Sequence, residues 1–197
     1  MERTADRAHE EVDARADVGG RPPAVGHNRA MKALVLILLG FWLGALVASW
    51  VVASANFRMV DRVLAEARPE MAQRLAPLPP DAQRQVLRYL ASENNRWMFG
   101  RWSVTQAVVG LLLVVLAWRL PGPARYVLLA VVILGAAQML LARPIVDVGR
   151  AIDFVPRPLP PDVRRRFGLL HAAFVVGDLV KAALLLAASW LVARPGA

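Results

Sequence analysis

Three ionisable residues, His171, Asp178 and Lys181, lie within one long apolar stretch near the end of the chain. On a helix that turns about 100° per residue, Asp178 lies about 20° from His171 and Lys181 about a further 60° round. The three side chains therefore share one helix face. Charged groups inside apolar helices usually face the protein interior and pair with each other. Asp178 and Lys181, three residues apart, have the spacing of such a pair.

Three further apolar stretches carry polar residues at matching depths, among them Thr105 and Gln106 near the start of one and Gln138 near the end of another. Together they define a candidate polar pocket, open on one side, formed by His171, Asp178, Lys181, Gln138, Gln106 and Thr105. Such a pocket suits a small polar ligand, a proton or a metal ion. The alternative is a hydrogen-bonded polar core that fixes the register of the helices. The sequence favours the alternative and leaves both open.

The positioning elements are four apolar stretches, at about residues 33–53, 102–118, 126–142 and 167–193. A helix needs roughly 20 mostly apolar residues to cross a bilayer, with about 17 as the lower limit. The sequence therefore predicts an all-α integral membrane protein whose four transmembrane helices lie within residues 33–193. Residues 1–32 are rich in charge and poor in large apolar side chains, which predicts a disordered N-terminal tail.

Two long connections, residues 54–101 and 143–166, fall on one side of the membrane if there are four crossings. Both are predicted to be partly helical and interfacial. Residues 56–68 form an amphipathic stripe that continues the first span, and residues 81–119 form one helix whose later half is the second span. The long connections carry 14 Lys and Arg residues against 9 on the other side, which favours a cytoplasmic position for them.

A faint internal repeat accompanies these connections. Pro-Leu-Pro-Pro-Asp occurs at residues 77–81 and 158–162, and Glu93-x-x-Arg96 echoes Asp178-x-x-Lys181. Asp81 is predicted to cap the helix that follows the first copy. Duplication and coincidence explain the repeat equally well.

Composition excludes several classes of protein. The chain has no cysteine, which rules out disulfides and cysteine metal sites, and it has no nucleotide-binding loop or hydrolase motif. The net charge is +9, but the arginines flank apolar runs, so the expected partner is the lipid bilayer and not nucleic acid. His171 is the only histidine in a span, so haem is not expected. We predict no catalytic residue, metal or cofactor.

The first span contains a stripe of small residues, Gly40, Gly44 and Ala48, at intervals of four. This pattern permits close approach of a second helix. The second helix is either another span of the same chain or a second copy of the protein, which would make a homo-oligomer.

The chain resembles the domain-of-unknown-function 4149 (transmembrane protein 205-like) family of four-span membrane proteins. The resemblance rests on Gln138 followed six residues later by Pro144, and on Phe167-x-x-x-His171 with Asp178 beyond it. It covers roughly residues 33–193. The first long connection is longer than in the family, and the charged pair stands where the family often has an uncharged amide. Since the family has no settled activity, the resemblance implies only architecture.

The resulting prediction is a non-enzymatic, multi-pass protein of a bacterial-type plasma membrane that acts through packing and through partner or lipid contacts. The alternative is a small transporter, or a ligand- or proton-binding carrier, that uses the pocket around His171, Asp178 and Lys181.

Overall fold

A computed structural model describes residues 24–120 and 122–194, and all the regular secondary structure within them is α-helical. The helices are α2 (Ala24–Glu66), α3 (Pro69–Leu75), α4 (Pro80–Ala117), α5 (Pro123–Ala151) and α6 (Pro161–Ala193). The all-α prediction is therefore confirmed. The chain divides into two compact units, residues 1–34 and 35–197. Residues 24–32, assigned to the tail by sequence, begin α2; the tail residues 1–23 lie outside the described part.

Proline begins four of these helices, at Pro69, Pro80, Pro123 and Pro161. Proline suits the first helical position because its φ angle is already helical and the N–H that it lacks would have no partner there. Asp81 and Asp162 follow in the first turns of α4 and α6, where a negative charge interacts favourably with the helix dipole. The prediction that Asp81 is a capping acceptor is wrong, because α4 has no side-chain cap hydrogen bond.

Three of the long helices extend well beyond the apolar stretches. The amphipathic stripe after the first span is confirmed as the end of α2, and the single helix predicted for residues 81–119 is confirmed as α4. Helix α5 continues through Pro144 to Ala151, beyond the expected end at 142. Proline removes one backbone hydrogen bond, but Val148 beyond it is buried and holds the extra turns. The connection to α6 is therefore only residues 152–160.

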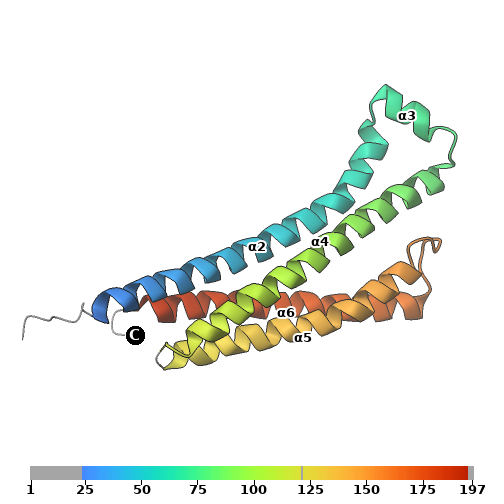
Figure 1. Cartoon of the computed structure of the whole chain (residues 1–197). Helices are drawn as coiled ribbons and strands as arrows, with labels where there is room; N and C mark the ends of the chain where they lie inside the picture. The colour runs from blue at the N-terminus through green and yellow to red at the C-terminus, as the bar shows by residue number, and fades with distance from the viewer. Residues whose placement is uncertain (1–23, 121, 195–197) are drawn as a thin grey trace, which may run out of the picture. The chain divides into compact units, whose positions relative to one another are not determined.

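The four long helices share an apolar core, with one leucine from each that is at most 1% exposed: Leu39, Leu113, Leu128 and Leu185. Helices α5 and α6 make the most extensive contact, and α4 packs on α5 (Figure 1). The end of α2 runs beside the beginning of α4, where Asn95 bonds to both Asn56 and the carbonyl of Ala53. Helix α3 joins these two helices.

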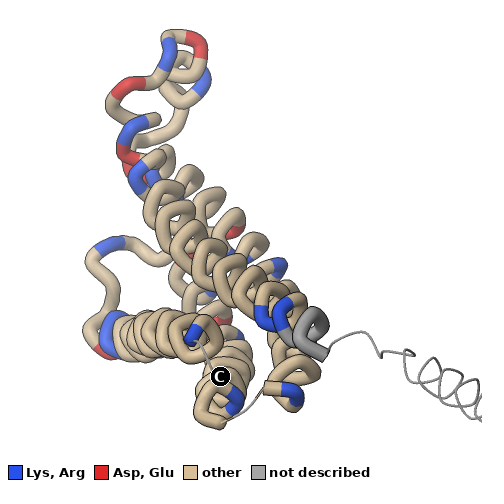
Figure 2. Tube along the Cα trace, turned by 90° about the vertical axis from the view of Figure 1, so that its left-hand side faces the viewer, with Lys and Arg blue, Asp and Glu red and all other residues tan. Residues whose placement is uncertain are grey.

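The outer surface of the bundle is apolar. Ile37, Leu111, Ile133 and Leu186, one from each long helix, are 66%, 66%, 68% and 58% exposed. Water-soluble monomers rarely show such extensive apolar surface. Charged residues instead gather at helix ends and around α3 (Figure 2). Four helices, α2, α4, α5 and α6, are long and apolar enough to cross a membrane.

Arginine and aromatic side chains mark both ends of the apolar surface. At one end Arg125 lies over the rings of Trp118 and Tyr126, and at the other Arg101 lies over Trp97. Amphipathic rings and arginines of this kind favour the level of lipid headgroups. From Arg101 to Arg119, and from Arg125 to Arg143, an uncharged helix rises about 27 Å at 1.5 Å per residue, close to the hydrocarbon thickness of a bilayer.

Candidate functional site

Lys181 of α6 lies at the centre of the buried polar residues. It is 0% exposed, and its ammonium group donates to acceptors on three helices. These acceptors are Gln106 Oε1 of α4 at 2.8 Å, Gln138 Oε1 of α5, and Asp178 Oδ1 of α6 at 3.0 Å. An ammonium group has three hydrogens to donate. The charge of Lys181 is therefore fully hydrogen-bonded inside the protein.

Asp178 is the negative partner and is 3% exposed. Its Oδ1 accepts from Lys181 and from Gln138 Nε2 at 2.9 Å, and its Oδ2 accepts from Trp50 Nε1 of α2 at 3.0 Å. The two opposite charges compensate each other. Because the acceptors and donors come from every long helix, this cluster fixes the axial position of all four.

Trp42 completes the cluster from α2. Its indole nitrogen donates to Gln106 Oε1 at 3.2 Å, and its ring is 1% exposed. The ring fills the space beside two glycines, since a Cβ at Gly110 of α4 or Gly135 of α5 would lie 3.5 or 3.4 Å from it. We call Trp42, Trp50, Gln106, Gln138, Asp178 and Lys181 the polar network.

Gly177 makes room for the network on α6. Gln138 Nε2 donates to the backbone carbonyl of Phe174 at 3.0 Å as well as to Asp178. This brings its side chain so close to α6 that a Cβ at position 177 would lie 2.8 Å from Nε2 and 3.2 Å from Cδ. Only glycine leaves space for this approach.

The polar network is closed and fully paired. In the part of the chain that the structure describes, every fully buried side-chain nitrogen or oxygen has a hydrogen-bond partner. Breaking a buried pair by removing one partner is strongly destabilising, because the other charge is left uncompensated. The arrangement is suited to fixing helix register, which is the second of the two alternatives that the sequence left open.

The structure brings together four of the six predicted pocket residues and leaves two outside. Gln106, Gln138, Asp178 and Lys181 meet in the network. His171 is exposed and its ring stacks on Phe167, with centroids 6.0 Å apart. Thr105 donates to the carbonyl of Arg101 in its own helix at 3.1 Å. His171 lies on α6 seven residues before Asp178, but its side chain stays on the exposed surface of that helix.

Sequence reasoning missed Trp42 and Trp50 as members of the network. Both tryptophans lie in or beside an apolar stretch, and a buried indole N–H usually donates to an acceptor. This pattern could have indicated them as members. Gln106 and Asp178 are the acceptors, but sequence alone does not show which helices are neighbours.

The stripe of small residues on α2 faces away from the core. A Cβ at Gly40 or Gly44 would meet nothing within 4 Å, and Ala48 is exposed. The alternative in which this stripe packs against another helix of the same chain is therefore wrong for the described residues. Self-association through the stripe stays a prediction.

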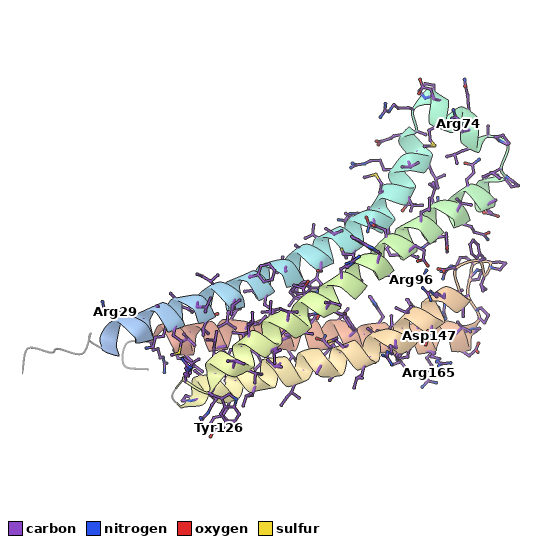
Figure 3. The ribbon with its side chains drawn as sticks, viewed as in Figure 1. Arg29, Arg74, Arg96, Tyr126, Asp147 and Arg165 are labelled. Atoms are coloured by element: carbon purple, nitrogen blue, oxygen red, sulfur yellow. The ribbon has the colours of Figure 1, made fainter. Side chains whose placement is uncertain are left out.

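A second polar cluster lies where α4 meets the α5–α6 connection. Arg96 donates to both carboxylate oxygens of Asp153, at 2.6 and 2.8 Å, and to Glu93 one turn earlier. Nearby, the rings of Tyr89 and Phe154 lie 5.1 Å apart. Figure 3 shows Arg96 near the middle of α4 and Asp147 toward the end of α5, with Tyr126 at the beginning of α5. The contacts tie the connection to α4.

Two clefts lie outside the polar network. One of ≈ 330 Å³ lies between α4 and α5 and is lined by Arg96, Phe99, Gly100, Ser103, Met139, Ala142, Arg143, Val146 and Asp147. The other, ≈ 160 Å³, lies between the end of α2 and the beginning of α4 and is lined by Phe57, Arg58, Val60, Asp61, Arg84 and Arg88. Neither lining includes Asp178 or Lys181.

Among the described residues, no group of three or more His, Asp or Glu side chains is placed to hold a metal ion. In comparisons with known proteins, no family model, curated protein or solved structure matches this chain. The resemblance to the four-span family therefore stays a prediction, and any functional assignment depends on the geometry alone.

Proposed function

We propose that the chain is a four-span integral membrane protein that acts without catalysis, through packing and through contacts with lipids or partner proteins. The observation that carries this proposal is the inverted distribution of polarity. Asp178 and Lys181, the two charges in the middle of the bundle, are paired inside, whereas large apolar side chains of all four long helices point outward. In lipid the outward surface is solvated, and the inner charges are acceptable only because they pair.

The proposal places the α2–α3–α4 connection and the α5–α6 connection on the cytoplasmic side. The Lys and Arg bias of the sequence supports this orientation. The short turn around Gly122, whose φ of +62° favours glycine, would lie on the opposite side. Interfacial arginine–aromatic contacts at both ends agree with two membrane surfaces.

The carrier alternative has weaker support. A carrier needs a ligand-accessible polar site, but Asp178 and Lys181 bond to each other and to two glutamines, and the two clefts lie elsewhere. His171, the third member of the predicted pocket, lies outside the network.

The absence of cysteine provides a clean test of topology. Single variants Ala76→Cys, before α4, and Arg119→Cys, in the short turn, are treated in intact cells with a membrane-impermeant thiol reagent. We expect Arg119→Cys to be labelled from outside and Ala76→Cys only after permeabilisation. The unsubstituted chain is the control for background.

Membrane insertion itself is tested by fractionation with alkaline carbonate, which strips peripheral proteins. We expect the chain to stay in the pellet and to require detergent for extraction. Release into the carbonate supernatant would refute the proposal. Labelling of positions 76 and 119 from the same side would refute the four-span topology.

A further inference from the structure

The α4–α5 cleft lies at the level where the uncharged parts of both helices end. Ser103 and Met139 fall inside the uncharged segments that Arg101 and Arg143 terminate, whereas Arg96 and Asp147 fall outside them. The lining therefore changes from apolar to charged along the helix axis. In a four-span protein that change coincides with the boundary between acyl chains and headgroups.

Two opposite charges at the mouth of the cleft are available to a ligand. Arg143 and Asp147 both line the cleft from α5, both are exposed, and neither makes a hydrogen bond or ion pair with another residue of the described chain. Residues four apart on a helix are neighbours, at about 5–6 Å between Cβ atoms. The cleft thus presents a cation and an anion side by side.

The third charge in the lining is fixed in place. Arg96 is held by Glu93 and Asp153, and its side chain is only 12% exposed. Two carboxylates already face it, so it adds little net positive charge to the cleft. Arg143 is therefore the main group for an anionic ligand atom, and Asp147 for a cationic one.

We propose that this cleft binds one phospholipid with a zwitterionic, amine-bearing headgroup, of the phosphoethanolamine type. The Arg143 guanidinium binds the phosphate, the Asp147 carboxylate accepts hydrogen bonds from the ammonium, and one acyl chain lies against Phe99 and Met139. The inference rests on the proposed membrane insertion and specifies which class of lipid the α4–α5 cleft binds.

Charge complementarity decides between headgroups. A phosphoglycerol headgroup carries the phosphate but no cation, so Asp147 would repel it. A phosphoethanolamine headgroup satisfies both groups of the cleft. A free zwitterionic solute would match the charges but would leave the apolar part of the cleft uncovered, which favours a lipid as the occupant.

The test uses the full chain in detergent, titrated with phosphatidylethanolamine or phosphatidylglycerol of identical acyl chains, with binding measured by native mass spectrometry. We expect about tenfold tighter binding of the ethanolamine lipid, because one charge-assisted contact has roughly that effect. Arg143→Gln weakens binding of both lipids about tenfold. Asp147→Asn removes the preference between them.

Arg150→Gln is the matched control, because it removes an exposed arginine from the same helix outside the cleft lining. It should bind both lipids as the parent chain does. Water-soluble glycerophosphoethanolamine, added in excess, should not displace the lipid. Displacement by that solute would overturn the assignment to a lipid.

Equal binding of the two lipids, or binding unchanged by Arg143→Gln, would overturn the inference while the proposed function stands, provided that the chain resists carbonate extraction. If the chain is water-soluble, the proposed function fails as well, so the two failures are distinguishable.

Discussion

At the scale of single residues, Lys181 and Asp178 determine how the interior is held. Lys181 donates to three helices, and Asp178 accepts from the fourth through Trp50. Hydrogen bonds between membrane helices average only about 0.6 kcal/mol each. The structural importance of this pair therefore lies less in its net strength than in the penalty for leaving one member alone.

Replacing either charge should destabilise the protein more than replacing both. Lys181→Met leaves the Asp178 carboxylate buried without its cation, and Asp178→Asn leaves the ammonium without its anion. Each single change should cost roughly 3–5 kcal/mol, and the double variant should recover most of that loss. Unfolding in mixed micelles with increasing denaturing detergent measures this directly. Normal folding of both single variants would contradict a structural role for the pair.

Gly177 should tolerate no side chain while the network is intact. In Gly177→Ala the new Cβ would lie 2.8 Å from Gln138 Nε2, so the amide must leave Asp178 and the carbonyl of Phe174. We expect a loss of about 1–3 kcal/mol in the free energy of unfolding, the penalty for unpaired buried groups.

Gly168→Ala is the matched control for this change, because it lies on the same helix and its Cβ would meet nothing within 4 Å. It should leave stability unchanged or raise it slightly, since alanine is the better helix former. Equal melting temperatures for the alanine variants of Gly177 and Gly168 would show that Gln138 can move without penalty.

The sequence allowed partial prediction at this scale. Gln106, Gln138, Asp178 and Lys181 were identifiable because polar side chains in apolar stretches usually have a partner. His171 shares the helix face in projection but lies outside the network, since a shared face does not show which side chains the neighbouring helices contact. The positions of Trp42, Trp50 and Gly177 depend on which helices are adjacent, which no single sequence specifies.

At the scale of elements, Trp42 is the largest fully buried side chain by which α2 packs on the bundle. Helices α5 and α6 contact each other extensively, and α4 packs on α5, whereas α2 reaches α4 and α5 through the Trp42 ring between Gly110 and Gly135. A large indole between two glycines keeps helix axes apart while filling the space between them. Trp42 is therefore a main packing contact of α2, beside the hydrogen bonds of Trp50 and Asn56.

Trp42→Ala should loosen α2 selectively. Removing a buried tryptophan typically costs 3–5 kcal/mol. Here it also leaves Gln106 with Lys181 as its only donor. We expect faster hydrogen exchange in the middle of α2 than in α5 or α6. Trp97→Ala, at a position 65% exposed, is the control and should change exchange little. A uniform increase over all four helices would argue against the selective role of Trp42.

Helix boundaries were less predictable than helix existence. The hydropathy of the four stretches indicated their centres, but α5 continues nine residues past its expected end at 142. The apolar stretch ends before Arg143, whereas buried Val148 and Ile152 stabilise turns beyond it. Burial of Val148 and Ile152, at about 1.5–3 kcal/mol each, offsets the roughly 3 kcal/mol that a proline inside a helix costs.

At the scale of the whole molecule, the polar network joins residues that lie far apart in sequence. Helices α2, α4 and α5 supply two tryptophans and two glutamines, and α6 supplies both charges. The network is therefore incomplete in any fragment that lacks α6. The number of long apolar helices was predictable from sequence because hydropathy indicates them. Which helices supply the members of the network depends on three-dimensional contacts.

A chain split in the α5–α6 connection, between residues 156 and 157, should reassemble when both fragments are expressed together. We expect the fragment that carries α6 to co-purify with the remainder through an affinity tag. The Lys181→Met form of that fragment should co-purify several-fold less, since a loss of 1.4 kcal/mol is a factor of ten. Equal recovery of the two forms would show that apolar packing alone joins α6 to the bundle.

The order of the chain has a consequence for biosynthesis. The ribosome delivers α6 after the other long helices, and until then Gln106 and Gln138 lack the ammonium group that they share. In the proposed topology, the earlier helices therefore insert before the network can form. A chain that ends before Lys181 leaves both glutamines without this donor. We therefore expect truncation before position 181 to give a product that is degraded.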